Sequence, residues 1–182
     1  MLVYIILGVI VLIVMYVLIT YNSLIMMKNR VEEAFSTMDV YLKKRWDLIP
    51  NLVETVKGYA SHEEETLKDV VLLRNSVYDN MSTSEKLEIN NKMTQGITKL
   101  MALAEAYPDL KANENFKNLS EKLTKLEDDI ANSRKYYNGT VRLMNNKVQM
   151  FPSNIVAGML GFKTLKMFEA ASDERENVKV QF

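Results

Sequence analysis

The side chains that most often do chemistry are scarce in this 182-residue sequence. It contains one histidine, His62, and no cysteine, which excludes thiol catalysis, disulfides, zinc–thiolate sites and iron–sulfur clusters. His62 stands in a His-Glu-Glu-Glu run, and no second histidine exists to complete a His-Glu-x-x-His metal site. Glycine-rich phosphate loops and the Gly-x-Ser-x-Gly motif are also missing. We therefore expect no catalytic residue, no cofactor and no metal, and we interpret His62 as part of a solvated helix N-terminus.

Two groups of charged side chains are the remaining candidates for a site. The acids at 127–129 are consecutive, and adjacent residues point around a helix rather than toward one cation. Arg45, Arg74 and Arg134 occupy positions that are otherwise apolar, where an arginine needs a carboxylate partner. We interpret these arginines as members of ion pairs that fix the register of packed helices. The alternative is a binding site along a helical bundle.

Composition indicates how such residues would be positioned. The chain is 48% hydrophobic and 25% charged, which is typical of one folded domain and not of a disordered chain. Lys+Arg and Asp+Glu both number 23, so net charge gives no reason to expect nucleic acid as a partner. Gly 6 and Pro 3 are too few for the many turns of an all-β fold. The expected class is therefore all-α, built from long helices.

The N-terminal segment is the strongest single signal. No charged side chain occurs from Met1 to Met27, and the run from Leu2 to Ile19 is almost entirely Leu, Ile and Val. About 20 such residues cross a hydrocarbon core of about 30 Å as one helix. The run is longer than a signal-peptide core and has no basic residues before it. We predict an uncleaved single-pass anchor at 1–22, and the cations that follow it place the remaining chain in the cytoplasm under the positive-inside rule.

The segment that follows the apolar run has the apolar stripe of a bundle helix. Its apolar residues recur every seven positions, which is also the spacing of a coiled coil. It includes Leu24, Val31, Met38, Arg45, Leu52 and Tyr59, with Phe35, Leu42, Ile49 and Val56 beside them. Because the pattern keeps its phase through Pro50, we predict one kinked helix over 22–59 and not two helices.

Three further helices are predicted, over 62–81, 85–106 and 113–150. Ser61-His62-Glu63-Glu64 and Ser82-Thr83-Ser84-Glu85 are capping-box patterns that begin the first two. Pro108 and Pro152 end the last two, and Ser153 and Asn154 could cap a short helix beyond. The inward face of the longest helix contains Phe116, Leu119, Leu123, Leu126, Ile130, Ser133, Tyr137, Thr140 and Met144.

The helix lengths predict the topology. The first and last helices should each reach about 57 Å and the middle two about half of that. Short connections make sequential helices antiparallel neighbours, so the last helix should run back along the first. Residues that face each other on these two helices should then have numbers that sum to about 171, which places Arg45 near Glu127 and Met38 near Arg134. The predicted bundle covers 23–151.

The segment at 152–168 would return to the membrane surface. It combines Ile, Val, Met, Leu and Phe with Lys163 and Lys166, and such a basic amphipathic stretch can lie among lipid headgroups. The alternative is that it packs on the lower end of the bundle. The tail at 169–182 is expected to be frayed.

Several motifs together resemble a known family. They are Tyr21-Asn22-Ser23-Leu24, the run at 38–59 that contains Arg45, Trp46 and Pro50, Arg134-Lys135-Tyr136-Tyr137-Asn138, and Phe151-Pro152-Ser153-Asn154. This set is similar to the LemA family of bacterial membrane proteins, over essentially the whole chain. Phe35, Met38 and Tyr41 stand where the family often has Trp, Ile and Gln.

The resemblance implies an N-terminal anchor, a cytoplasmic helical domain and no established activity. It also implies a role in organising membranes, because one magnetosome-forming relative is associated with membrane biogenesis. Family members are often encoded beside a TPM-domain protein or a membrane metallopeptidase, which are the partners to expect.

These observations lead to three hypotheses for function. The first is a non-catalytic scaffold that contacts the lipid bilayer, forms homo-oligomers and recruits partners or shapes the membrane. The second is a regulatory adaptor of a membrane protease or an envelope-stress system. The third, an enzyme that uses carboxylates of the bundle, would require a deep polar pocket around Arg45 and Glu127.

Overall fold

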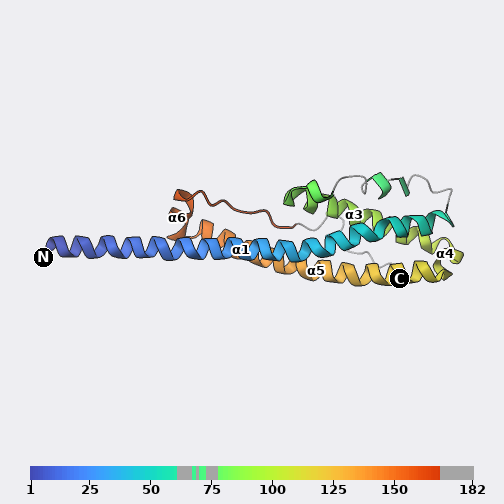
Figure 1. Ribbon diagram of the computed structural model, residues 1–182, viewed down its shortest axis with the longest axis horizontal. Coiled ribbons are helices and arrows are strands. Elements are labelled where there is room, and N and C mark those ends of the chain that lie inside the picture. The colour runs from blue at the N-terminus through green and yellow to red at the C-terminus, as the bar shows by residue number, and fades with distance from the viewer. Residues whose placement is uncertain (61–66, 69, 73–77, 169–182) are drawn as a thin grey trace, which may run out of the picture. The chain divides into compact units, whose positions relative to one another are not determined.

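The computed structural model describes residues 1–60, 67–68, 70–72 and 78–168 (Figure 1). All regular secondary structure in this part of the chain is helical, which confirms the predicted all-α class. The chain divides into two compact units. Unit 1 consists of Met1–Met38 and Ser133–Met167, and unit 2 consists of Asp39–Asn132 with the C-terminal residues from Phe168. The two longest helices, α1 and α5, each contribute one part to each unit.

Helix α1 spans Leu2–Lys57 without interruption. Its first part is long and apolar enough to cross a membrane, and the side chains of that stretch are not covered by the rest of the protein. Thr20 is the first buried residue of the helix, followed by Leu24 one turn later. The folded part of unit 1 therefore begins where the apolar run ends.

Pro50 lies inside α1, so the prediction of one helix through the proline is confirmed. Proline removes one hydrogen bond of the helix, to the carbonyl of Trp46. Burial of Ile49, Leu52 and Val53 on either side of Pro50 compensates, because each large apolar side chain taken out of water contributes about 1.5–3 kcal/mol. The helix ends at Lys57, directly before Gly58. Tyr59 lies beyond that end and is 43% exposed, so its assignment to the apolar stripe was wrong.

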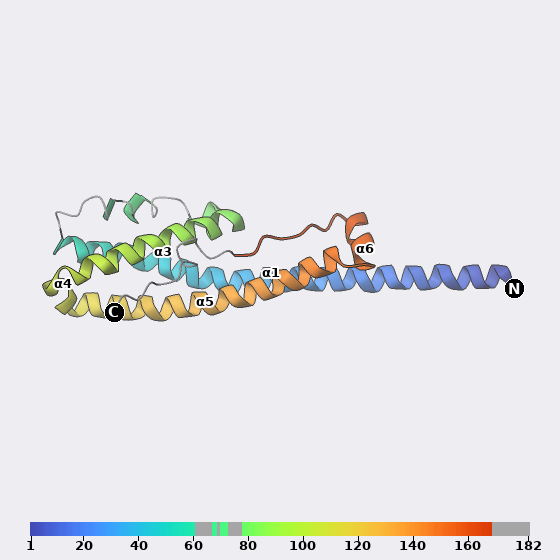
Figure 2. The ribbon, with the colours of Figure 1, turned by 180° about the vertical axis from the view of Figure 1, so that it is seen from behind.

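In unit 1, α1 packs against the C-terminal part of α5, which spans Glu114–Gln149 (Figure 2). Lys147 donates a hydrogen bond to Ser23, and the rings of Phe35 and Tyr137 meet edge to face at 5.9 Å. The numbers in these pairs total 170 and 172, which confirms the predicted antiparallel register. The buried side chains of this unit include Leu24, Val31, Ala34, Met38, Tyr137, Val141 and Met144.

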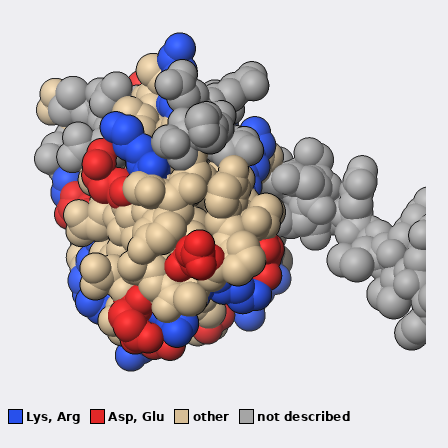
Figure 3. All heavy atoms as spheres, turned by 90° about the vertical axis from the view of Figure 1, so that its right-hand side faces the viewer, with Lys and Arg blue, Asp and Glu red and all other residues tan. Residues whose placement is uncertain are grey.

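In unit 2, the last part of α1 packs with α3 (Thr83–Glu105), with α4 (Pro108–Ala112) beyond it and with the first part of α5. The Nδ2 atom of Asn113 donates to the hydroxyl of Tyr59 at 2.9 Å, which gives the same antiparallel register of α1 and α5 within this unit. Buried residues come from all three long helices: Leu42, Trp46, Ile49, Leu52, Met93, Ile97, Leu100, Leu123, Leu126 and Ile130. The face of unit 2 drawn in Figure 3 mixes acidic and basic side chains.

The predicted start of α3 is confirmed in atomic detail. The hydroxyl of Ser82 accepts from the backbone N–H of Glu85, and the Glu85 carboxylate accepts from the backbone N–H of Ser82 at 2.7 Å. These bonds pair N–H groups that have no partner inside the helix. The Ser82 hydroxyl also donates to the Glu85 carboxylate at 2.6 Å, and this bond, together with the one from the Ser82 N–H, holds the pKa of the Glu85 carboxyl below its usual value of 4.5. The other capping box, at 61–64, lies outside the described residues, as do His62 and Arg74.

Two junctions differ from the predictions. Pro108 does not only follow α3; it is the first residue of α4, where a missing N–H costs nothing. Ser153 is the first residue of α6 (Ser153–Met159) and does not cap it. Its hydroxyl donates backward to the carbonyls of Lys147 at 2.7 Å and Met150 at 2.9 Å. Ser153 therefore provides a donor for the Lys147 carbonyl in the last turn of α5.

Of the predicted helix at 62–81, only separate pieces are described. Leu67 and Val70 are buried, and Tyr78–Asn80 form a 3-10 turn in place of the predicted last turn of α-helix.

Candidate functional site

The centre of the candidate site is the guanidinium group of Arg45. Arg45 is in unit 2, on the face of α1 that otherwise carries apolar side chains, and it is 2% exposed. A charge withdrawn from water in this way is costly unless it is paired and hydrogen-bonded. The surroundings of Arg45 must therefore supply acceptors.

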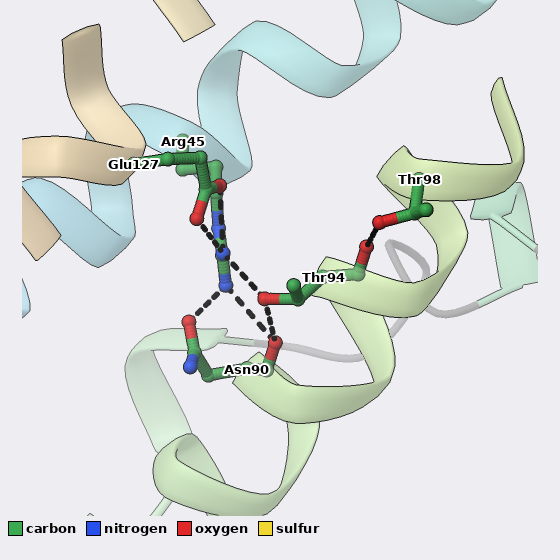
Figure 4. Close-up of polar contacts among 5 residues, drawn as sticks. All are labelled: Arg45, Asn90, Thr94, Thr98 and Glu127. Carbon is green, nitrogen blue, oxygen red and sulfur yellow. Dashed lines mark hydrogen bonds and ion pairs between the residues drawn. The ribbon is translucent and has the colours of Figure 1, made fainter. Parts of the chain in front are cut away.

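Those acceptors come from two other helices (Figure 4). From α5, the Glu127 carboxylate accepts from Nη1 at 2.9 and 3.2 Å. From α3, Thr94 Oγ1 accepts from Nη1 at 3.0 Å, and the carbonyl of Asn90 accepts from Nη2 at 3.1 Å. The side-chain oxygen of Asn90 accepts a further bond from Nη2. One cation thus connects α1, α3 and α5, and the predicted neighbourhood of Arg45 and Glu127 is confirmed.

The α3 side of this cluster is a short chain of hydrogen bonds. The Thr94 hydroxyl donates to the Asn90 carbonyl at 3.2 Å, and the Thr98 hydroxyl donates to the Thr94 carbonyl at 3.0 Å. The carbonyl of Asn90 therefore accepts from both Arg45 and Thr94. Asn90 and Thr94 were missed in the sequence, although they extend the buried face of α3 by one turn from Met93 and Ile97. A polar residue on such a face, opposite an inward arginine, is the signal that could have found them.

The space around the cluster is very small. A cavity of about 10 Å³ is lined by residues of α1 and α3 together with Tyr78, and Asn90 is among them. The Nδ2 atom of Asn90 is buried there without a hydrogen-bond partner among the described residues. A cavity of this size holds about one water molecule, whereas small-molecule sites typically measure about 300–1,000 Å³. The cluster is therefore a closed internal contact and not a pocket for a substrate.

A second polar cluster surrounds Asp39, also in unit 2. Its carboxylate accepts from the Tyr78 hydroxyl at 2.6 Å and from Lys86 at 2.8 Å. The Lys86 ammonium lies 4.6 Å from the centre of the Tyr78 ring, a cation–π distance, and Trp46 packs on the same ring at 5.2 Å. Trp46 itself is buried. This cluster attaches the Tyr78 turn and the start of α3 to α1.

An open groove lies on the surface of unit 2 between α1 and α5. It encloses about 400 Å³ and is lined by Lys44, Asp47, Leu48, Lys122, Lys125, Leu126 and Asp129. Asp129 belongs to the run of three acids at 127–129, which we expected to point around a helix and not toward one cation. Within the described residues, no three His, Asp or Glu side chains come close enough to hold a metal ion.

The remaining sequence candidates do not gather in one place. Arg134 and Asn138 lie half-buried on α5 in unit 1, and the proximity of Arg134 to Met38 stays a prediction. Pro152 joins α5 to α6, preceded by a cis peptide bond. Lys163 and Lys166 are exposed and follow α6, so 152–168 is not one amphipathic helix.

Tyr137 ties this C-terminal segment to α5. Its hydroxyl donates to the carbonyl of Lys166 at 3.2 Å, and burial raises the pKa of the phenol above its usual value of 10.0. Asn145 makes two more bonds to the segment, from Nδ2 to the Leu165 carbonyl at 2.9 Å and from the Leu165 N–H to Oδ1 at 2.8 Å. The extended part of the segment therefore packs on the bundle, which is the alternative that the sequence left open.

Comparison with known proteins finds a family and several relatives. The model of the LemA family matches residues 34–182, a range that includes the whole Arg45 cluster. The chain is 26% identical to Protein LemA of Metamycoplasma hominis over 158 residues, which cover 86% of this chain and 72% of the relative.

Two magnetosome proteins are also similar. Magnetosome protein MamQ of Magnetospirillum gryphiswaldense is 23% identical over 177 residues, with 83% of this chain and 65% of the relative covered. Magnetosome protein MamQ 2 of Paramagnetospirillum magneticum is 23% identical over 178 residues, with 84% and 65% covered. The chain thus spans slightly less than two thirds of the length of the two magnetosome relatives.

Proposed function

This chain belongs to the LemA family, and we propose that it is a membrane-anchored, non-catalytic scaffold that self-associates and organises membrane proteins or membrane shape. The observation that carries the proposal is the continuity of α1. One helix, Leu2–Lys57, contains both the apolar stretch and the stripe that packs each folded unit. A rigid helix transmits position from a bilayer to the unit that it supports, which is what a scaffold requires.

The closed Arg45 cluster supports a structural role over a catalytic one. All the acceptors that it uses come from this chain, and the space beside it holds about one water molecule. The hypothesis of an enzyme that uses bundle carboxylates required a deep polar pocket at this point. The larger opening in unit 2, next to Leu126, is the open surface groove, whose mixed Lys and Asp lining suits contact with another protein.

We propose that the folded units lie in the cytoplasm. Lys28 and Arg30 follow the apolar run in sequence, and the bond from Lys147 to Ser23 places a third cation near the same end of the run. Cations at one end of a span favour the cytoplasmic side. Because the chain has no cysteine, a Val40→Cys variant carries a unique thiol on an exposed position. A membrane-impermeant maleimide should label it only after cells are opened; labelling in intact cells would reverse the orientation.

Self-association is tested with the full chain in lipid. Donor-labelled and acceptor-labelled Val40→Cys protein is mixed in vesicles, and energy transfer is followed while lipid is added at constant protein. A scaffold that self-associates retains its energy transfer on dilution. An unrelated single-span protein with the same dyes gives the random-proximity control. Transfer that falls to that control level, together with a monomer mass in mild detergent, would refute the proposal.

The second candidate is a regulatory adaptor of a membrane protease, such as a membrane metallopeptidase or a complex with a TPM-domain protein. The groove favours it, because Lys122 and Lys125 from α5 face Lys44 and Asp47 from α1 there. A Lys122→Glu/Lys125→Glu variant that is normally folded should change the turnover of the protease's substrates, whereas Lys135→Glu, on exposed α5 surface in unit 1, should not. Unchanged turnover in a strain that lacks the gene would remove this candidate.

A further inference from the structure

Large apolar side chains are left uncovered where α5 meets α6. Phe151 and Met159 are 79% and 80% exposed, and Met150, Ile155 and Leu160 are exposed as well. In the same short helix, Val156 and Ala157 are buried. Helix α6 therefore packs through one face and presents another apolar face outward, and soluble proteins rarely leave such a patch on their surface.

The position of this patch is set by α1. Lys147, near the end of α5, donates to Ser23, and Ser153 bonds back to the carbonyl of Lys147, so α6 starts close to Ser23. Ser23 is four residues after Ile19, the end of the apolar run, or about 6 Å along the helix. A headgroup layer extends about 5–8 Å beyond the hydrocarbon core. Figure 1 likewise draws α6 nearer to the N-terminus than the end of α5.

Charge points to what covers the patch. The stretch at 133–167 contains six Lys and Arg and no Asp or Glu, and unit 1 as a whole has eight cations and two acids, a formal charge of +6. Because the chain is neutral overall, its remaining residues carry −6. A second copy of the patch would bring cations against cations. The surface of an anionic bilayer supplies the opposite charge and an apolar boundary together.

We propose that α6 and the turn before it form a second membrane contact, in which Phe151, Ile155 and Met159 insert at the headgroup–acyl boundary of the bilayer that α1 crosses. Lys163 lies four residues beyond Met159 and meets anionic headgroups. This contact rests on the proposed anchoring by α1. It would fix unit 1 to the membrane at two points, so that unit 1 cannot rotate freely about the anchor.

The test uses the full-length protein, whose lack of cysteine makes any single thiol unique. A Met159→Cys variant carries an environment-sensitive dye and is reconstituted in vesicles of phosphatidylcholine and phosphatidylglycerol that contain nitroxide-labelled lipid. The lipid nitroxide should quench this dye strongly. Tyr136→Cys is the matched control, because it is 56% exposed on α5 in unit 1 and lies 11 residues before Lys147, about 16 Å farther from the apolar run of α1. Its dye should stay accessible to a water-soluble quencher.

A third variant separates this inference from the anchoring on which it rests. Val9→Cys lies within the apolar run and must be quenched by lipid if α1 spans the bilayer. Quenching at position 9 but not at 159 overturns the second contact and leaves the anchor intact. Quenching at neither position overturns the anchor itself. A Met159→Cys spin label that senses another copy, with no lipid quenching, would assign the patch to a homo-oligomer and also overturn the proposal.

The charge contribution has its own comparison. A lysine near an anionic membrane surface contributes about 1 kcal/mol, which is about fivefold in an equilibrium constant. Lys163→Gln in the Met159→Cys background should therefore lower the ratio of lipid-docked to undocked dye about fivefold in the anionic vesicles and leave it unchanged in phosphatidylcholine alone. Lys135→Gln should change neither, because it is more than a Debye length from the patch. An equal effect of the two substitutions would show that headgroup contact by Lys163 is not involved.

Discussion

Replacing Glu127 by glutamine removes the negative charge that faces the buried guanidinium of Arg45 and keeps the size of the side chain. The guanidinium retains its acceptors on α3, namely Thr94 and the two oxygens of Asn90. It loses the charge-assisted bonds of 2.9 and 3.2 Å to α5. The contact between α5 and the other two helices of unit 2 should weaken as a result.

The expected cost follows from burial. Removing one partner of a buried ion pair costs about 3–5 kcal/mol, and one hydrogen bond to a charged group contributes about 1.5–3 kcal/mol. Arg45 is 2% exposed, but the Glu127 side chain is 31% exposed and water can replace part of the interaction. Glutamine also keeps one acceptor. We therefore expect a loss of about 2 kcal/mol, or about 4–8 °C in Tm for a chain of this size.

Trp46 makes the assay specific to unit 2. It is the only tryptophan in the chain, it is 6% exposed, and its ring lies 5.2 Å from that of Tyr78. Its emission during heating in detergent therefore follows the packing of this unit, while far-UV circular dichroism follows all helices. The Glu127→Gln variant should lower the midpoint of the Trp46 transition.

Two controls give the result its meaning. Glu88→Gln breaks an exposed ion pair, in which the Glu88 side chain is 72% exposed and the Lys92 side chain 57%. This substitution should change the free energy of unfolding by less than about 1 kcal/mol. In an Arg45→Met background, Glu127→Gln should have almost no further effect, since no cation remains. If the Trp46 midpoint of Glu127→Gln equals the midpoints of Glu88→Gln and the wild-type protein, the α3 acceptors alone satisfy Arg45. The Arg45–Glu127 bond would then not stabilise the packing of α5 on α1 and α3.

Four further results are expected. Ser82→Ala should cost about 1 kcal/mol through loss of the cap of α3, measured by thermal unfolding. Because the folded pKa of Glu85 is depressed, the stability that its carboxylate contributes is present above pH 4.5 and is lost as the pH falls through the folded pKa. Glu85→Gln should therefore flatten the acid end of a circular-dichroism titration, and an unchanged titration would contradict this. Asn145→Ala should speed amide exchange at Leu165, which loses its acceptor, without changing the Trp46 midpoint. Asp39→Asn should lower the free energy of unfolding by about 1 kcal/mol and with it the midpoint of the Trp46 transition, since the carboxylate accepts from two side chains. An unchanged midpoint would show that the cluster is dispensable.

The large elements of this protein follow from local patterns. An uncharged apolar run, stripes at helical spacing and the Ser82–Glu85 capping box depend on neighbours within one or two turns, so α1, α3 and α5 could be predicted close to their true bounds. Helix length then set the antiparallel register, and with it the Arg45–Glu127 pair. The short helix α4 was missed, because a proline reads equally as the end of one helix and the start of the next.

Tertiary packing decided which polar groups meet. The sequence by itself determined an all-α chain with an apolar span, an inward Arg45, and no histidine pair or cysteine for catalysis. Polar residues on the apolar face of α3 were a signal that Arg45 has partners there, but the sequence could not show that these partners are Asn90 and Thr94, since that depends on how α1 packs on α3. Nor could it separate α6 from the extended segment that Tyr137 and Asn145 hold against α5. Those outcomes depend on contacts between residues far apart in the chain, and only the folded structure brings them together.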